Sequence, residues 1–186
     1  PSVAAYTLSQ DLLGSYDANV DLRYSHWFNS VKNVGWVWLK YSVLTASPAS
    51  EVSSEFLLRL PEVYLNKAEA LIMLGRTEEA IDVLRTLREK RLAAGTTDVI
   101  PTSQEDLVQF VRLERRLELC GEGHRWFDLR RYAVHPTFPE EKEIVHESVK
   151  NGSKIGYYRL APYSENSNNW VWPIPEDAVI FNDGAL

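Results

Sequence analysis

The chain has 186 residues, a net charge of −6, 45% hydrophobic residues and 25% charged residues. This length and composition are typical of a folded protein with one hydrophobic core, and we expect residues 1–186 to form a single domain. The acidic balance argues against a nucleic-acid partner, because binding to phosphates requires a basic surface. The single cysteine, Cys120, excludes an internal disulfide and a cysteine-based zinc cluster.

No apolar run approaches the roughly 20 residues that a membrane span needs. The sequence starts at Pro1 without a methionine, a basic leading region or a cleavage site. We therefore expect the chain to be a piece of a longer protein, with any targeting segment outside it.

The first 54 residues have an irregular pattern. A short strand is predicted at residues 36–40, where Trp36 and Trp38 alternate with aliphatic residues. Residues 45–50, which are rich in Ser and Ala with one Pro, are typical of a loop.

Two antiparallel helices with a short connection are predicted next. Pro61 suits the first turn of a helix, where its missing N–H costs nothing, and Gly75 suits the left-handed conformation that ends one. Thr77 is expected to cap the second helix. The small residues Ala68 and Ala80 allow close approach, and the pair resembles one tetratricopeptide repeat (TPR). Because a lone repeat cannot bury its face, its neighbours are expected outside this chain.

Ser103 and Asp106 predict the start of a third helix with a capping-box-like pattern. We expect the buried face of this helix to consist of Leu107, Phe110, Leu113, Leu117 and Cys120. Gly121 and Gly123 interrupt it, and a short fourth helix is predicted after them.

Residues 143–149 and 154–160 alternate around Asn151-Gly152, which is a strong signal for a two-residue β-hairpin. The tail after it is rich in Asn, Ser and Pro and is typical of an extended segment. Together these elements predict a mainly α fold: TPR-like helical pairs with long irregular segments and a small β-hairpin.

The densest charged motif lies at residues 114–131. Glu114 and Glu118 are four residues apart on one helix face, which is a plausible spacing for an acid–base pair. Arginines crowd the same segment, however, and each lowers the pKa of a nearby carboxyl, whereas a general acid needs a raised pKa. We therefore favour an Arg–carboxylate network that locks two helices across a glycine kink over a catalytic site.

Other catalytic and metal-binding patterns are absent from the sequence. The histidines have no metal-ligand spacing; they are His26, His124, His135 and His146. No Gly-rich phosphate loop and no G-x-S-x-G elbow occurs, and Cys120 lies on an apolar helix stripe, where a core role is expected. We predict no catalytic residue, no metal and no cofactor.

Two Trp-x-Trp pairs carry the candidate ligand chemistry. Residues two apart in an extended chain face the same way, so such a pair can form an aromatic platform for the C–H face of a sugar. For Trp170 and Trp172 we prefer the alternative, in which they anchor an extended segment to the core. For Trp36 and Trp38, with nearby Trp27, both interpretations stay open, with a smaller preference for a core role. The candidate ligand-binding residues are Trp27, Trp36, Trp38 and Tyr41.

Four segments, in order along nearly the whole chain, resemble the SusD/RagB family of nutrient-binding lipoproteins. Residues 58–70 resemble the family's R-x-x-E-v-y-L-x-x-A-E-A helix, and residues 114–131 resemble its ERRxEL…GEGxRWFDLRR signature. Residues 21–23 are similar to its D-x-R element, and residues 173–182 are similar to its closing P-I-P-x-x-E-x-x-x-N.

The resemblance implies a non-enzymatic protein of the outer membrane that captures oligo- or polysaccharide at the cell surface. It implies a SusC-like TonB-dependent transporter as partner, and a lipid anchor outside this chain as the link to the membrane. It also implies that the chain is a C-terminal portion without the N-terminal helical repeats and the lipoprotein signal. Two alternatives stay open: a helical-repeat scaffold that binds only a protein partner and, less favoured, a glycoside hydrolase.

Overall fold

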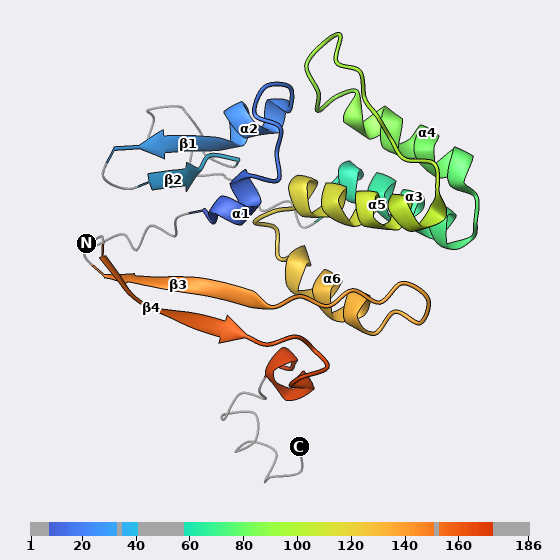
Figure 1. Ribbon diagram of the computed structural model, residues 1–186. Helices are drawn as coiled ribbons and strands as arrows, with labels where there is room; N and C mark the ends of the chain where they lie inside the picture. The colour runs from blue at the N-terminus through green and yellow to red at the C-terminus, as the bar shows by residue number, and fades with distance from the viewer. Residues whose placement is uncertain (1–7, 33–34, 41–57, 151–152, 173–186) are drawn as a thin grey trace. The chain divides into compact units, whose positions relative to one another are not determined.

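The computed structural model describes residues 8–32, 35–40, 58–150 and 153–172 (Figure 1). The helices are α1 (Gln10–Leu13), α2 (Leu22–Trp27), α3 (Leu60–Met73), α4 (Thr77–Arg88), α5 (Gln104–Glu118), α6 (His124–Ala133) and the 3-10 helix η1 (Ser167–Trp170). The strands are β1 (Phe28–Val31), β2 (Gly35–Trp38), β3 (Ile144–Lys150) and β4 (Ser153–Leu160). Among the described helices, none is long and apolar enough to cross a lipid bilayer.

The chain forms two compact units, Pro1–Glu122 and Gly123–Leu186. The first holds α1 to α5 and the β1–β2 hairpin, and the second holds α6, the β3–β4 hairpin and η1. The mainly α class is confirmed, while the single domain expected over the whole chain stays a prediction.

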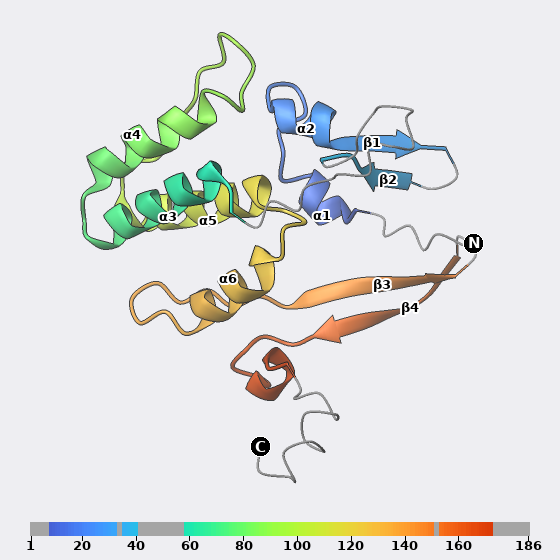
Figure 2. The ribbon, with the colours of Figure 1, turned by 180° about the vertical axis from the view of Figure 1, so that it is seen from behind.

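Helices α3 and α4 form the predicted pair, and α5 lies beside α3 in both views (Figures 1 and 2). Pro61 occupies the first turn of α3, and Gly75, with φ of 73°, ends it as predicted. Ala68 and Ala80 are fully buried, as their small size requires at a close contact. The cap predicted at Thr77 is wrong, because α4 begins at Thr77 itself and Arg76 occupies the N-cap position without a side-chain hydrogen bond.

The predicted buried face of α5 is only partly correct. Leu107, Leu117 and Cys120 are buried, but Phe110 is half-buried and the Leu113 side chain is 42% exposed. Val108 and Val111 are buried as well, and charged side chains take the other buried positions of the helix: Arg112, Glu114, Arg115 and Glu118. A pattern that counts only apolar residues misplaces the face of a helix that buries ion pairs.

The first 40 residues contain more structure than the irregular pattern predicts. The strand expected at residues 36–40 is β2, and it pairs with β1 in an antiparallel hairpin that the sequence did not reveal. Phe28 of β1 belongs to a hydrophobic core cluster with Leu13, Tyr16, Leu117 and Cys120. The Tyr16 hydroxyl donates a hydrogen bond to the Leu117 carbonyl over 2.7 Å, which ties the turn after α1 to the end of α5. The expected core role of Cys120 is confirmed.

In the second unit, the predicted hairpin is confirmed as β3 and β4, with Glu147 opposite Tyr157. Its turn, residues 151–152, lies outside the described residues. Trp170 is buried and its Nε1 donates to the Ala161 carbonyl over 2.9 Å, as expected of an anchor. Trp172 does not match that expectation, because its side chain is 68% exposed. The two indoles differ because Trp170 ends a 3-10 helix and is not part of an extended strand.

Removing the α5 cap by Ser103→Ala should lower the free energy of unfolding by about 1 kcal/mol. The Ser103 Oγ accepts a hydrogen bond from the Asp106 N–H over 3.2 Å, and alanine leaves that donor unsatisfied. Thr77→Ala is the matched control, since it removes a hydroxyl that caps nothing. Urea denaturation measures both variants, and equal losses would contradict the assigned caps.

Candidate functional site

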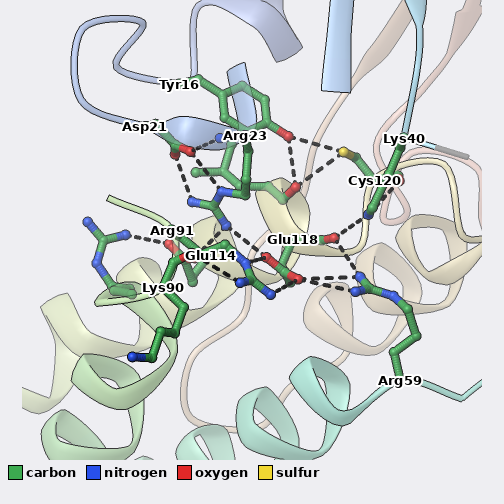
Figure 3. Close-up of polar contacts among 12 residues, drawn as sticks. Tyr16, Asp21, Arg23, Lys40, Arg59, Lys90, Arg91, Glu114, Glu118 and Cys120 are labelled. Atoms are coloured by element: carbon green, nitrogen blue, oxygen red, sulfur yellow. Dashed lines mark hydrogen bonds and ion pairs between the residues drawn. The ribbon is translucent and has the colours of Figure 1, made fainter. Parts of the chain in front are cut away.

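A buried network of ion pairs joins α2 to the end of α5 (Figure 3). Arg23, which is 2% exposed, lies at its centre. Its guanidinium donates to the Asp21 carboxylate over 2.9 and 2.8 Å, to Glu114 over 2.6 Å and to Glu118 over 3.2 Å. Asp21 also caps α2 by accepting the Arg23 N–H over 3.0 Å. A planar, permanently charged guanidinium is suited to hold several carboxylates at once.

Glu118 has no exposed surface and receives guanidinium groups from distant segments. Arg91 binds its carboxylate with two hydrogen bonds of 2.8 and 2.9 Å, and Arg59 approaches it to 3.4 Å. Burial alone raises the pKa of the Glu118 carboxyl, but the hydrogen bonds and charges of these arginines and of Arg23 outweigh it and hold the pKa below its ordinary value. This carboxylate therefore stays ionised, which is the opposite of what a general acid requires.

Glu114 connects the same network to the end of α4. Arg88 donates to its carboxylate and also binds Asp98 with hydrogen bonds of 2.8 to 3.0 Å. The loop after α4 is thereby fixed against α5. Both carboxylates of the suspected acid–base pair are engaged by arginine. Within the described part of the chain, no three side chains of His, Cys, Asp or Glu are grouped to hold a metal ion.

Glu114 and Glu118 lie in an Arg–carboxylate network, but its partners differ from those expected, and the lock between two helices across the glycine kink stays a prediction. The arginines that bind Glu114 and Glu118 come from other segments: Arg23, Arg59, Arg88 and Arg91. The motif's own Arg115 binds Asn66 over 2.6 Å, and its Arg116 pairs with Asp11. Neighbouring positions on a helix point in different directions, so an adjacent arginine cannot fold back onto Glu114. In the sequence, Arg23 and Arg59 stood out only because they lie in residues 21–23 and 58–70, which resemble the SusD/RagB family. No sequence pattern indicated a role for Arg88.

Lys40 connects the network to residues 36–40, which we call the aromatic segment. Figure 3 shows its ammonium group pointing toward the end of α5. Its side chain is 3% exposed, and Nζ pairs with Glu122 and donates to the Glu118 carbonyl. The same Nζ lies 4.1 Å from the ring centroid of Trp27 and 5.7 Å from that of Trp38. Burial lowers the pKa of Lys40, and Glu122 opposes this shift. A cation over an indole face is attracted by its quadrupole, so Lys40 stabilises both rings.

The structure brings three of the four candidate ligand-binding residues into one cluster, and Tyr41 lies outside the described residues. The three are the half-buried Trp27, Trp36 and Trp38, and they pack against the hydrophobic core cluster. Trp36 lies 5.4 Å from Tyr24, and Trp38 lies 5.6 Å from Phe28, between ring centroids. The Leu39 N–H donates to the Trp27 carbonyl over 2.7 Å, which joins the residues after β2 to α2. A half-buried indole combines an ordered ring with a free edge or face, which suits stacking against a sugar.

Replacing Glu118 by Gln should lower the free energy of unfolding by about 3–5 kcal/mol, because it removes the buried carboxylate that Arg23, Arg59 and Arg91 share. It should also flatten the acid side of the stability profile. The folded pKa of Glu118 lies below the ordinary value of 4.5, so its stabilisation is present above that pH and is lost as the pH falls through the folded pKa.

Thermal denaturation between about pH 6 and about pH 3 measures both effects. Glu79→Gln is the matched control, because Glu79 pairs with Arg76 on the surface, where both side chains are more than half exposed. That change should leave stability nearly unchanged. A Glu118→Gln protein with the parent's stability and pH profile would contradict the role given to the network.

Comparison with known proteins places the chain in one family. The sequence model of the SusD family matches residues 10–185. SusD-like protein P38 of Formosa agariphila is 41% identical over 98 residues, which are 50% of this chain and 20% of that protein. SusD-like protein P2 of the same organism is 32% identical over 101 residues, with the same shares. The match therefore spans about a fifth of the length of these relatives.

A solved structure gives the same result for the fold. The crystal structure of a SusD superfamily protein from Bacteroides thetaiotaomicron matches with a TM-score of 0.57 and 29% identity, over 68% of this chain and 30% of that chain. The family match covers nearly all of the sequence, and the resemblance first noted at residues 21–23, 58–70 and 114–131 is confirmed. The chain belongs to the SusD family.

Proposed function

We propose that this chain is the C-terminal portion of a glycan-binding component of a SusC/SusD-type nutrient uptake system. In this proposal the protein captures oligo- or polysaccharide at the cell surface and delivers it to a SusC-like TonB-dependent transporter. It is held at the outer membrane by a lipid anchor outside these residues. The observation that carries the proposal is a cluster of half-buried tryptophans, in a chain of the SusD family, fastened to a buried ion network.

The aromatic cluster has the chemistry that sugar recognition uses. Indole rings cover the C–H face of a sugar, while polar groups nearby bind its hydroxyls. Trp27 and Trp36 retain some exposed surface, and the adjacent strand β1 carries the exposed polar residues Asn29 and Ser30. We propose Trp27, Trp36, Trp38 and Tyr41 as the ligand-binding residues.

The network gives this cluster a rigid support. Recognition groups on loops work best when a stable scaffold fixes their rotamers, because less conformational freedom is then lost on binding. Lys40 connects the cluster to Glu122 and to the end of α5, and Glu118 connects α5 to residues of α2 and of the loop after α4. The frame is therefore in place before a ligand arrives.

The same contacts favour binding over chemistry. A glycosidase of the usual type needs a pair of carboxyl groups, one with a raised pKa, on either side of the scissile bond. Glu114 and Glu118 are instead covered by arginines, and the pKa of Glu118 is lowered. We therefore propose that the protein releases no sugar from the glycans it binds.

The Trp36→Ala variant of the full-length protein should lose affinity for a polysaccharide that retards the parent in native affinity electrophoresis. Loss of one stacking ring, worth about 1 kcal/mol, corresponds to a roughly fivefold weaker interaction. Trp172→Ala is the matched control, because it removes a 68% exposed indole of the second unit and should bind as the parent does. Urea denaturation of both variants verifies that each is folded.

Three results would contradict the proposal in different ways. A parent that is retarded by no polysaccharide but binds the transporter would indicate a scaffold for a protein partner. New reducing ends that appear with the parent and disappear with Glu114→Gln would indicate a glycoside hydrolase. Equal retardation of a folded Trp36→Ala variant and the parent would place the glycan site elsewhere in the protein.

A further inference from the structure

Gly121, just after α5, lies directly against the indole of Trp38. Its φ is 77°, so the backbone is left-handed there, where glycine is favoured. A Cβ built at this position would be 2.5 Å from Cζ2 and 2.8 Å from Cη2 of Trp38. Carbon atoms in contact are about 3.5–4.0 Å apart, so any other residue would force the indole or the backbone to move.

The steric demand at Gly121 is separate from its backbone conformation. Gly75, Gly95 and Gly123 also have positive φ, of 73°, 83° and 82°. A Cβ added to any of them would meet nothing within 4 Å. Their backbone conformation is thus enough to account for glycine at these positions. At Gly121 the side-chain hydrogen is also required, because Trp38 occupies the space.

The position of Trp38 affects the whole cluster. Trp38 pairs with Phe28 across the β1–β2 hairpin, and the two rings are 5.6 Å apart. Trp36 lies two residues earlier on the same strand, opposite Ser30, so it faces the same side of the strand. Lys40, two residues after Trp38, carries its charge to the ring of Trp27. If Trp38 is displaced, we expect β2, which carries Trp36, and Lys40, which lies at the ring of Trp27, to move with it.

We propose that Gly121 is a positioning residue for the glycan-binding cluster. Because it has no side chain, it leaves the space that the indole of Trp38 occupies. This inference rests on the proposed function, because it assigns a role within the same site. Gly121 does not contact the sugar. It fixes Trp38, and through β2 and Lys40 it fixes the spacing of the rings that do.

The test compares Gly121→Ala with Gly95→Ala in full-length protein labelled with 5-fluorotryptophan. Both substitutions impose the same left-handed strain, but only the first meets a side chain. Fluorine NMR then follows each tryptophan, and the Trp38 resonance is identified by its loss in Trp38→Leu. We expect the Trp38 resonance to move in Gly121→Ala and to stay in place in Gly95→Ala. Retardation by polysaccharide should weaken by about fivefold or more only in Gly121→Ala.

A second-site variant separates this role from a simple loss of folding. Trp38→Leu removes the indole, so Gly121→Ala should lower the free energy of unfolding less in the Trp38→Leu background than in the parent. If Gly121→Ala lowers stability equally in both backgrounds, or leaves the Trp38 resonance unmoved, Gly121 does not position the indole of Trp38. A moved resonance with parental retardation would overturn its role in binding. If no polysaccharide retards the parent, both the proposed function and the role of Gly121 in binding are contradicted. The spectra and the stability comparison would still show whether Gly121 positions the indole of Trp38.

Discussion

A carboxylate without exposed surface must be neutralised or paired, because transferring an unpaired charge from water to the protein interior costs several kcal/mol or more. Glu118 meets this requirement through Arg23, Arg59 and Arg91, which lie far apart in the sequence. Its charge is compensated only when the N-terminal segment, the start of α3 and the loop after α4 converge on α5. The ion network therefore joins distant segments of the first unit to α5.

The aromatic segment depends on that arrangement. Lys40 is buried, and its charge is balanced by Glu122 and by the carbonyl groups at the end of α5. This places a cation at the face of Trp27 and fixes the residues after β2. Arginines pair with both Glu114 and Glu118 and hold the pKa of Glu118 below its ordinary value, and the same network reaches the tryptophans through Lys40. The same interactions thus argue against catalysis and favour recognition.

The parts of the fold that the sequence predicted are those with local causes. Pro61 and Ser103 are found in the first turn and at the cap of their helices, and Gly75 ends α3, because the backbone itself selects these residues. The prediction failed at Thr77, because a threonine at the start of a helix can be either the N-cap or the first helical residue. Thr77 begins α4 and does not cap it. Leu113 was misplaced because the apolar pattern ignores buried ion pairs.

The pairing of the site is the part that local rules could not give. The contact of Arg88 with Glu114 links residues 26 positions apart, and that of Lys40 with Glu122 spans 82 positions. The local sequence around Arg88 or Lys40 does not indicate which carboxylate each one pairs with. The contact of Gly121 with Trp38 is equally hidden, because a left-handed turn alone is enough to explain a glycine there. The tryptophans were identified from composition and spacing, whereas their common support became visible only in three dimensions.

The most direct measurement is native-state hydrogen exchange of the Leu39 amide, which donates to the Trp27 carbonyl over 2.7 Å. If the network holds the aromatic segment, Lys40→Met should speed exchange at Leu39 by about tenfold or more, while amides of α4 keep the parent's rates. Lys90→Met, at an exposed lysine beside the network, should change neither. Unchanged exchange at Leu39 in Lys40→Met would show that the aromatic segment is held without the network, and would contradict this explanation of the site.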